Sequence, residues 1–230
     1  MSRVIFIEGV DGSGKTTLIN KLKEKYKTAN VEFLTPFSFE EGGKEKLLSI
    51  AESSDLKKEI TYLADVHKRF KAMLNERLEN QIETFFIVDR SIMSFLAYQL
   101  LDYKYAMERK KSFDNPKEIE ILLSQVSYFP FEASFIYLDV KKDILLNRVE
   151  ERKEKDILDK RLMFGYDSLL RLYRESFFYL TSSDKHLYKK PNNTLDDMYK
   201  IIEFVDQKIE SQRPIKNITK VKGGKKERRS

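Results

Sequence analysis

A glycine-rich loop between an apolar run and a helix-forming segment constrains this chain more than any other feature. Residues 4–17 read VIFIEGVDGSGKTT, and residues 9–16 fit the pattern G-x-x-x-x-G-K-[ST] without a mismatch. The apolar run predicts a strand, and the residues after the loop have the spacing of an amphipathic helix. A strand, such a loop and a helix in this order indicate a nucleoside triphosphate site rather than a chance match.

The residue types of the loop suit phosphate binding. Glycines let successive backbone N–H groups point inward, and the start of a helix adds the positive end of its dipole. Lys15 is expected to reach the outer phosphates, and Thr16 to offer its hydroxyl to Mg²⁺. The residues expected to hold phosphate are Gly9, Gly12, Ser13, Gly14, Lys15, Thr16 and Thr17.

The order of elements predicts an α/β fold. Strands are expected at residues 3–8, 31–34, 85–88, 134–139 and, more weakly, 186–188. Helices are expected at residues 16–26, 44–51, 55–81, 91–107, 116–128, 141–153, 162–180 and 194–209. Strands that alternate with helices predict a parallel sheet, here of five strands, with helices on both faces.

Composition limits the classes of function. The net charge is +6, but residues 211–230 hold eight basic side chains against one acid, which leaves −1 for residues 1–210. The folded part is therefore expected to lack a basic face for nucleic acid, and the tail to be disordered. Cysteine is absent, which excludes disulfides and thiolate metal sites. Without a secretory signal or a long apolar run, we expect a cytoplasmic protein and no membrane partner.

A second polar pair ends the expected strand at residues 85–88. Asp89 and Arg90 follow its apolar residues, and the carboxyl ends of parallel strands meet at one edge of a sheet, where ligands bind. Asp89 is a candidate ligand of Mg²⁺ or of water, or a general base. Arg90 is a candidate bidentate clamp on a second phosphate. The alternative is a purely structural ion pair.

Three stretches together resemble the thymidylate kinase family. Residues 89–99 match its pattern D-R-x-x-x-S-x-x-A-Y-Q, and residues 6–17 match its form of the phosphate loop. Residues 136–140 match its Y-L-D-V strand, which is followed by arginines. The resemblance extends over residues 1 to about 208. It implies a nucleoside monophosphate kinase-type fold at residues 1–210, with a short lid near residues 148–162.

The resemblance also implies an activity. It is the ATP-dependent transfer of a phosphoryl group, with Mg²⁺, to a deoxynucleoside 5′-monophosphate, most typically dTMP. By analogy, Asp11 meets the sugar hydroxyl of the acceptor and Arg90 clamps its phosphate, while Ser94 and Gln99 line the nucleotide site. Small-molecule nucleotides are then the partners, and a homodimer packed through helices is the expected assembly.

The lid is expected to supply a catalytic arginine. Members of the family carry this arginine in either the phosphate loop or the lid, and the loop here has none. Arg152 is the first candidate and Arg148 the second; they are four residues apart and so share one face of a helix. Arg161 lies beyond a charged run and could equally be a solvated side chain.

The match is weakest where the family reads the base. Tyr62 aligns with an aromatic residue that stacks on thymine, although packing in the helix core is an equal alternative. Val66 stands where the family has a base-reading arginine, and Arg69 lies one turn further on and is a substitute candidate. Ser91 gives the sequence D-R-S, which resembles the E-R-S of deoxynucleoside kinases, enzymes that phosphorylate uncharged nucleosides.

These departures leave alternatives open. One is a deoxynucleoside kinase or a deoxynucleoside monophosphate kinase of broad specificity. Another is a non-catalytic, ATP-binding paralogue that works through its basic tail. We expect no nucleic-acid binding except a weak attraction through that tail.

Overall fold

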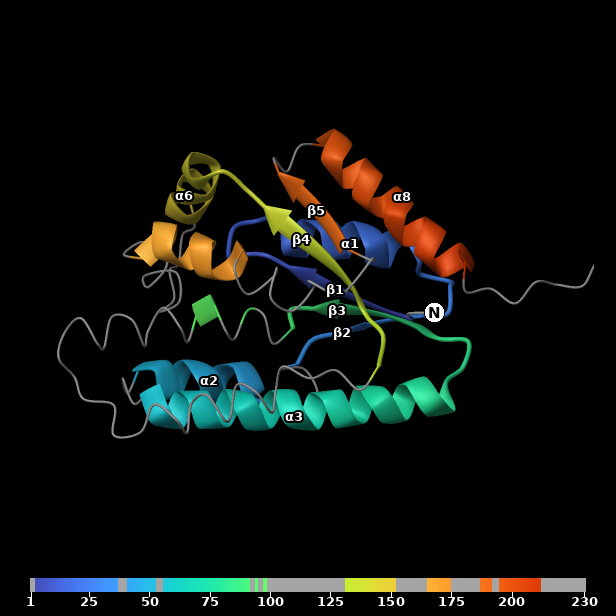
Figure 1. The fold of residues 1–230 in the computed structure, drawn as a ribbon, viewed down its shortest axis with the longest axis horizontal. Coiled ribbons are helices and arrows are strands. Elements are labelled where there is room, and N and C mark those ends of the chain that lie inside the picture. Colours follow the sequence, from blue (N-terminus) through green and yellow to red (C-terminus); the bar gives the residue numbers. More distant parts are fainter. Residues whose placement is uncertain are drawn as a thin grey trace, which may run out of the picture.

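The fold is built on a parallel sheet of five strands in the order β2-β3-β1-β4-β5 (Figure 1). The strands are β1 Val4–Glu8, β2 Val31–Leu34, β3 Phe85–Asp89, β4 Ser134–Asp139 and β5 Leu187–Pro191. In the computed structural model, the described residues are 3–36, 41–52, 56–91, 94, 97–98, 131–151, 165–174, 187–191 and 195–211.

The central strand, β1, pairs with β3 along one edge and with β4 along the other, and all of its residues are buried. Its side chains alternate between two apolar clusters, as the pleat of a strand requires. Val4 and Phe6 point into one cluster, and Ile5 and Ile7 into the other. The continuous apolar run in the sequence thus reflects two cores, one on each face of the sheet.

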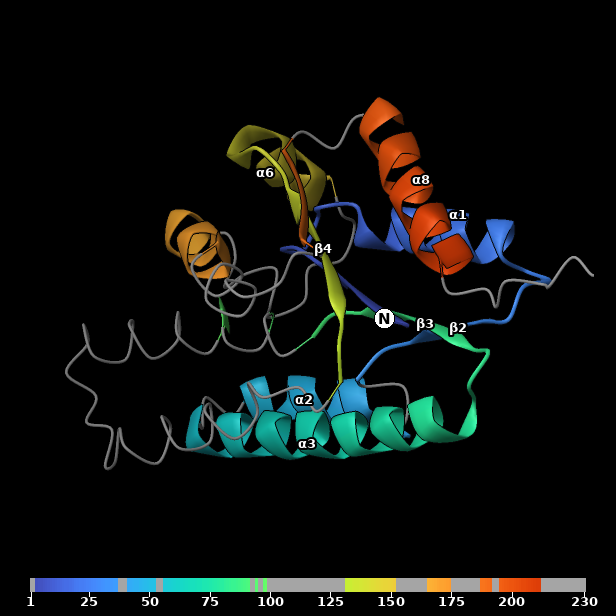
Figure 2. The same cartoon turned by 45° about the vertical axis from the view of Figure 1, so that its right-hand side comes forward.

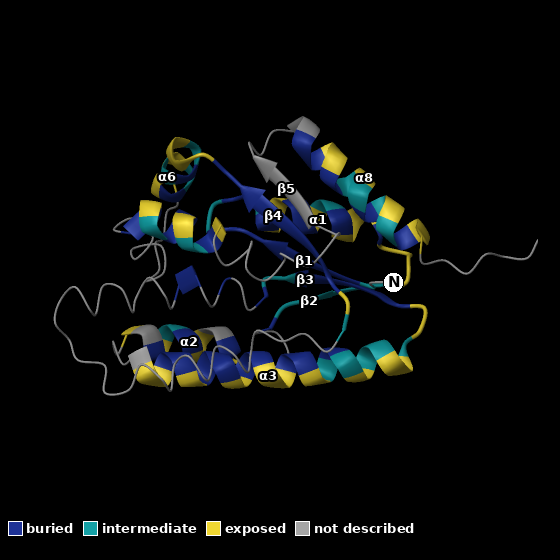
Figure 3. Ribbon diagram, in the orientation of Figure 1, coloured by how far each residue is buried: buried dark blue, intermediate teal, exposed yellow. Residues whose placement is uncertain are grey.

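The helices lie in two layers around this sheet. α1 (Lys15–Lys25) and α8 (Leu195–Ser211) pack on one face, while α2 (Gly43–Glu52) and α3 (Leu56–Asn80) lie on the opposite side (Figure 2). Side chains of α6 (Lys142–Glu150) and of a helical segment at residues 165–174 join those of α3 in the cluster that contains Val4 and Phe6. Figure 3 shows the expected pattern of α3, whose ribbon alternates between buried and exposed residues along the helix.

The predicted strands and helices agree with this fold, with small shifts at their ends. The strands at 31–34 and 134–139 have the expected bounds, and β5 is longer than expected and ends in Pro191. A proline is tolerated there because β5 is an edge strand. α6 ends at Glu150, three residues earlier than predicted. Most of the helices expected at 91–107 and 116–128 fall outside the described residues.

Arg3 was expected to begin the first strand, but it lies just before β1 and caps another element. Its Nη1 donates to the carbonyls of Gln81, at 2.5 Å, and Thr84, at 3.3 Å, and its Nη2 donates to that of Leu78. The Leu78 carbonyl lies in the last turn of α3, where backbone acceptors have no partner within the helix, and the other two carbonyls follow the helix. Arg3 thus ties the turn between α3 and β3 to the start of β1.

No helix in the described ranges is long and apolar enough to cross a membrane.

Candidate active site

The phosphate loop leaves the carboxyl end of β1 through two glycines in conformations that other residues rarely adopt. Gly9 has a φ of 150°, and a Cβ there would lie 2.5 Å from Ser13 Oγ. Gly12 has a φ of 82°, and a Cβ there would lie 3.1 Å from Leu145 Cδ2 on α6. The glycines are therefore required by close packing beneath the loop as well as by its backbone path.

Lys15 folds back over this loop. Its Nζ donates to the carbonyls of Gly9, at 2.7 Å, and Val10, at 3.0 Å, and the side chain is only 6% exposed. Burial, followed by the positive charge of Arg90, lowers the pKa of Lys15 to about 8. An ammonium group has three N–H donors, so one remains for an anion after these two bonds.

The remaining loop residues differ in how far they are available to a ligand. Thr16 and Thr17 are exposed at the start of α1, as a phosphate or metal ligand needs to be. Ser13 is buried under the loop, and its backbone N–H donates to the Val10 carbonyl at 3.1 Å. A role for Ser13 in phosphate binding stays a prediction, since its N–H already closes a turn within the loop.

Arg90 lies beside the loop because the chain bends sharply after β3. Its φ is 73°, a left-handed conformation that is strained for a residue other than glycine, and its N–H donates to the Ile7 carbonyl at 3.0 Å. Its guanidinium pairs with Asp11 through Nη2, and its Nη1 donates to Ser94 Oγ at 3.1 Å and to Tyr173 Oη at 3.3 Å. Burial alone would lower the pKa of Arg90, but Asp11, together with Tyr173, Tyr98 and Asp89, outweighs it and raises that pKa.

Asp11 is held from two sides. It accepts from Arg90, and its other oxygen accepts from Tyr98 Oη at 2.6 Å.

The guanidinium of Arg90 keeps two donors for a ligand. A guanidinium has five N–H donors. Within the described residues, the Arg90 Nε–H and one Nη2–H have no partner. Two parallel donors are what a bidentate contact with a phosphate needs.

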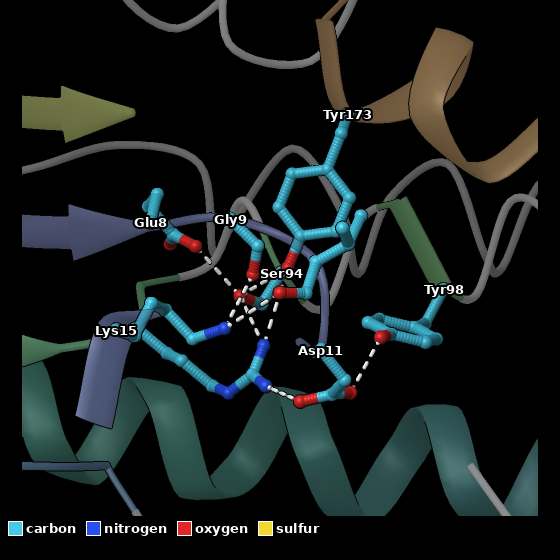
Figure 4. A network of polar contacts seen from close by, with 9 residues as sticks. Glu8, Gly9, Asp11, Lys15, Ser94, Tyr98 and Tyr173 are labelled. Carbon is cyan, nitrogen blue, oxygen red and sulfur yellow. Dashed lines mark hydrogen bonds and ion pairs between the residues drawn. The ribbon is translucent and has the colours of Figure 1, made fainter. Parts of the chain in front are cut away.

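Glu8 is fully buried. Figure 4 shows its side chain in the same network of polar contacts as Asp11 and Ser94. Its carboxylate accepts from the backbone N–H and the hydroxyl of Ser91, and from Ser94 Oγ at 2.6 Å. Burial raises the pKa of Glu8, although these hydrogen bonds and the charge of Arg90 oppose the rise. Tyr173 Oη donates to Ser94 Oγ at 2.6 Å, which links the residues 165–174 helix to the same network.

Asp89 and Thr16 are the predicted ligands of Mg²⁺. Asp89 Oδ1 is buried at the end of β3 and has no hydrogen-bond partner among the described residues. Nowhere in those residues do three His, Cys, Asp or Glu side chains converge as a metal site. Mg²⁺ in kinases is usually held by one or two protein oxygens together with substrate phosphates and water, so these two residues fit such a site.

α6 packs directly on the phosphate loop. Besides the contact of Leu145 with Gly12, Arg148 Nη1 donates to the Gly12 carbonyl at 3.1 Å. The structure thus brings the second candidate arginine to the loop. The first candidate, Arg152, and also Arg161 lie outside the described residues, so the choice between lid arginines stays a prediction.

The residues expected to contact the base have mixed surroundings. Tyr62 is buried, its Oη donates to the Gly43 carbonyl at 3.0 Å, and Lys46 Nζ lies 4.7 Å from its ring centroid. This packing between α2 and α3 corresponds to the core alternative for Tyr62. Arg69 is exposed and forms an ion pair with Asp65 at 2.8 Å. Gln99 lies outside the described residues, so the base-contact predictions remain open.

Three side chains of this site had no predicted role: Glu8, Tyr98 and Tyr173. Glu8 gave one signal, since it is a charged residue at the end of a run that is otherwise apolar. A carboxylate is seldom buried without partners. Tyr173 gave none, because an aromatic residue on an apolar helix face usually belongs to the core. Its contact with Ser94 depends on tertiary structure.

Comparisons of sequence identify relatives of this chain. A family model described as thymidylate kinase matches residues 7–193. The thymidylate kinase of Campylobacter hominis is 30% identical over 213 residues, which cover 88% of this chain and 99% of the relative. That of Blochmanniella floridana is 26% identical over 189 residues, which cover 77% of this chain and 83% of the relative.

Comparisons of structure give the same fold. The thymidylate kinase of Candida albicans superposes with a TM-score of 0.69 at 19% identity, over 91% of this chain and 93% of that one. A deoxyadenosine kinase from M. mycoides superposes with a TM-score of 0.56 at 16% identity, over 90% of this chain and 99% of that one. At these identities the likeness is one of fold, which both kinds of kinase share.

Proposed function

Because this chain belongs to the thymidylate kinase family, we propose that it transfers the γ-phosphoryl group of ATP to dTMP and produces ADP and dTDP. In this reaction an oxygen of the dTMP phosphate bonds to the γ-phosphorus. The bond from that phosphorus to the bridging oxygen breaks, and ADP leaves with the electron pair. Such a transfer depends mainly on positioning and on neutralising charge.

One observation carries this proposal: the phosphate loop and a partly buried arginine meet at one edge of the sheet. β1 leads into the loop with Lys15, and its neighbour β3 ends in Asp89, which Arg90 follows. The ion pair between Arg90 and Asp11 joins the two ends. Two phosphate-binding groups on adjacent strands suit a reaction between two phosphates better than the hydrolysis of one.

On the donor side, Lys15 supplies the positive charge. Its ammonium group leaves the loop carbonyls or adds a third bond, and so contacts the outer phosphates of ATP. The exposed Thr16 hydroxyl and the unpartnered Asp89 Oδ1 would hold Mg²⁺, directly or through water. When bound, Mg²⁺ neutralises charge on the phosphates.

On the acceptor side, Arg90 binds the phosphate of dTMP. Its Nε–H and remaining Nη2–H form the bidentate contact, while Ser94 and Tyr173 hold Nη1. Asp11, fixed by Arg90 and Tyr98, is the acceptor for a sugar hydroxyl. An uncharged nucleoside gains little from such a clamp, which favours the monophosphate over the nucleoside as acceptor.

The lid completes the site from α6. Arg148 already contacts the Gly12 carbonyl, and Arg152 follows it by four residues in the sequence. An arginine from this segment would stabilise charge on the transferring phosphoryl group, in place of the arginine that the loop lacks. The same segment would exclude water, which competes with dTMP as acceptor.

A coupled assay of ADP release tests the proposal. The protein is supplied with ATP, Mg²⁺ and, in turn, dTMP, dUMP, dCMP, dGMP, dAMP or thymidine. Turnover led by dTMP is the expected result. Equal rates with several monophosphates would indicate a kinase of broad specificity, and turnover of thymidine alone would indicate a deoxynucleoside kinase. If no acceptor is turned over, the proposed function is wrong.

Two controls make this assay specific. Lys15→Met should abolish turnover, whereas Lys23→Met, a matched change on the exposed side of the same helix, should leave it unchanged. A chain shortened by deletion of residues 212–230 should keep its kcat, because the tail has no part in the proposed chemistry. Loss of function on that deletion would favour the non-catalytic alternative. The homodimer stays a prediction.

A further inference from the structure

The hydrogen bonds around Ser94 have only one consistent direction. Ser94 Oγ lies 2.6 Å from the Glu8 carboxylate, 2.6 Å from Tyr173 Oη and 3.1 Å from Arg90 Nη1. When the Glu8 carboxylate is ionised it only accepts, so in that state the single Ser94 proton is donated to Glu8. The two lone pairs of Ser94 are then filled by Tyr173 and Arg90.

Tyr173 is held so that its hydroxyl stays in this arrangement. Its ring is fully buried, stacks on Tyr137 with centroids 6.0 Å apart, and meets the edge of Tyr98 at 6.1 Å. Its proton is donated to Ser94, which leaves its oxygen to accept from Arg90 at 3.3 Å. Arg90 Nη1 therefore faces two acceptors, Ser94 Oγ and Tyr173 Oη. Ser94 can accept because its own proton is donated to Glu8, and Tyr173 can accept because its proton is donated to Ser94.

Glu8 is also fixed at its other oxygen. This oxygen accepts from both the backbone N–H and the hydroxyl of Ser91, the residue after Arg90. A buried carboxylate is unfavourable unless it is fully hydrogen-bonded. For Glu8, three hydrogen-bond donors and the nearby guanidinium of Arg90 compensate the cost of burying the carboxylate. Glu8 thus holds the chain at two points just after Arg90, at Ser91 and at Ser94.

We propose that Glu8 is a positioning residue for the phosphate-binding arginine. Its carboxylate sets the direction of the hydrogen bonds through Ser94 and Tyr173, so that Nη1 of Arg90 is held and its remaining donors face the acceptor phosphate. Glu8 itself touches no substrate. This inference rests on the proposed function, because it takes Arg90 to bind the phosphate of dTMP.

Glu8→Gln tests the direction of the bonds with little change in shape. The oxygen of the amide must face the Ser91 N–H, so the amide nitrogen must face Ser94 and becomes a donor to it. Ser94 then has three donors for two lone pairs, so either Arg90 is displaced or the bond between Ser94 and Tyr173 reverses and leaves the Tyr173 proton without its acceptor. In the opposite orientation, the nitrogen of the amide faces the backbone N–H of Ser91. Two donors then face each other, and the hydrogen bond between them is lost.

The measurement is steady-state kinetics with both substrates. We expect the KM for dTMP to rise about 10- to 100-fold in Glu8→Gln, the loss typical of a hydrogen bond to a charged group, while the KM for ATP stays within about threefold. A merely structural role would lower the melting temperature and the active fraction but leave the KM for dTMP unchanged. That result would overturn the inference.

A double-mutant cycle shows whether Glu8 acts through Ser94. Ser94→Ala removes Oγ, the acceptor for which the surplus donors compete in Glu8→Gln. The double variant should therefore have a KM for dTMP no higher than that of Glu8→Gln alone. If the two effects multiply instead, Glu8 acts by another route and the inference is wrong. Val205→Ala, a cavity in the core of α8, is the control that lowers stability without changing the KM for dTMP.

The outcome is decisive even if Glu8→Gln fails to fold. Tyr173→Phe removes one donor to Ser94 and one acceptor for Arg90, and it should raise the KM for dTMP about 3- to 10-fold without raising that for ATP. If both Tyr173→Phe and Ser94→Ala leave the KM for dTMP unchanged, the inference is wrong. A wild-type protein that fails to turn over dTMP would instead refute the proposed function, and it is measured first.

Discussion

Replacing Arg90 by alanine or by glycine separates its two roles, in binding and in the backbone. Both changes remove the Nε–H and the remaining Nη2–H, which we expect to hold the acceptor phosphate. A hydrogen bond between charged groups contributes about 1.5–3 kcal/mol, so two contribute about 3–6 kcal/mol. This predicts a loss of about 10²- to 10⁴-fold in kcat/KM for dTMP, equal in the two variants, with little change in the KM for ATP.

The same two variants should differ in stability. Arg90 has a φ of 73°, which costs about 1–2 kcal/mol for any residue with a Cβ. Glycine relieves this strain but gains entropy in the unfolded chain, so Arg90→Gly should be more stable than Arg90→Ala by about 1 kcal/mol. For a domain of this size, that is about 2–4 °C in melting temperature.

Steady-state kinetics and thermal denaturation of both variants test this reasoning, with Arg77→Ala as the control. Arg77 is an arginine at the far end of α3 that pairs with Glu32, and its loss should leave kcat/KM unchanged. If either Arg90 variant keeps kcat/KM within tenfold of the wild type, Arg90 is not the clamp. If Arg90→Ala is at least as stable as Arg90→Gly, the strain argument fails.

Three further predictions concern the donor side. Because burial lowers the pKa of Lys15 to about 8, kcat/KM for ATP should be constant below that pH and fall above it, where the ammonium group loses its proton. A pH profile that is flat to pH 10 would contradict this. Gly12→Ala should melt lower than Gly42→Ala, since both have a positive φ but only Gly12 meets α6, and equal melting temperatures would show that the contact is unimportant. Asp89→Asn should raise the Mg²⁺ concentration for half-maximal rate about tenfold or more, and an unchanged Mg²⁺ titration would remove Asp89 from the metal site.

Local patterns predicted the elements of this fold and the edge of the sheet where the site lies. An apolar run, a glycine-rich loop and a helix are signals carried by neighbouring residues, and they located β1, the loop and α1 to within a residue. The same holds for Asp89 and Arg90, since the end of a buried strand can be recognised from the sequence alone. The family resemblance then supplied the activity.

What the sequence could not predict are contacts between distant positions. Glu8 meets Ser94, and Ser94 meets Tyr173, across separations of 86 and 79 residues. No periodicity relates such positions, because the sheet order and the packing of the residues 165–174 helix bring them together. Tyr62 is a further example: its alignment pointed to a base, which stays a prediction, while the bond from its hydroxyl to the Gly43 carbonyl could not be predicted from the sequence.

The position of β1 in the sheet has a consequence for the synthesis of the chain. β1 is made first, yet its partners β3 and β4 begin only at Phe85 and Ser134. At about 5–20 residues per second, β1 waits on the order of ten seconds for its second neighbour. Until then its apolar edges are open, as in strands that aggregate. Nascent chains that stop before β4 should therefore need protection by chaperones, and nucleotide cannot help them fold because its site does not yet exist.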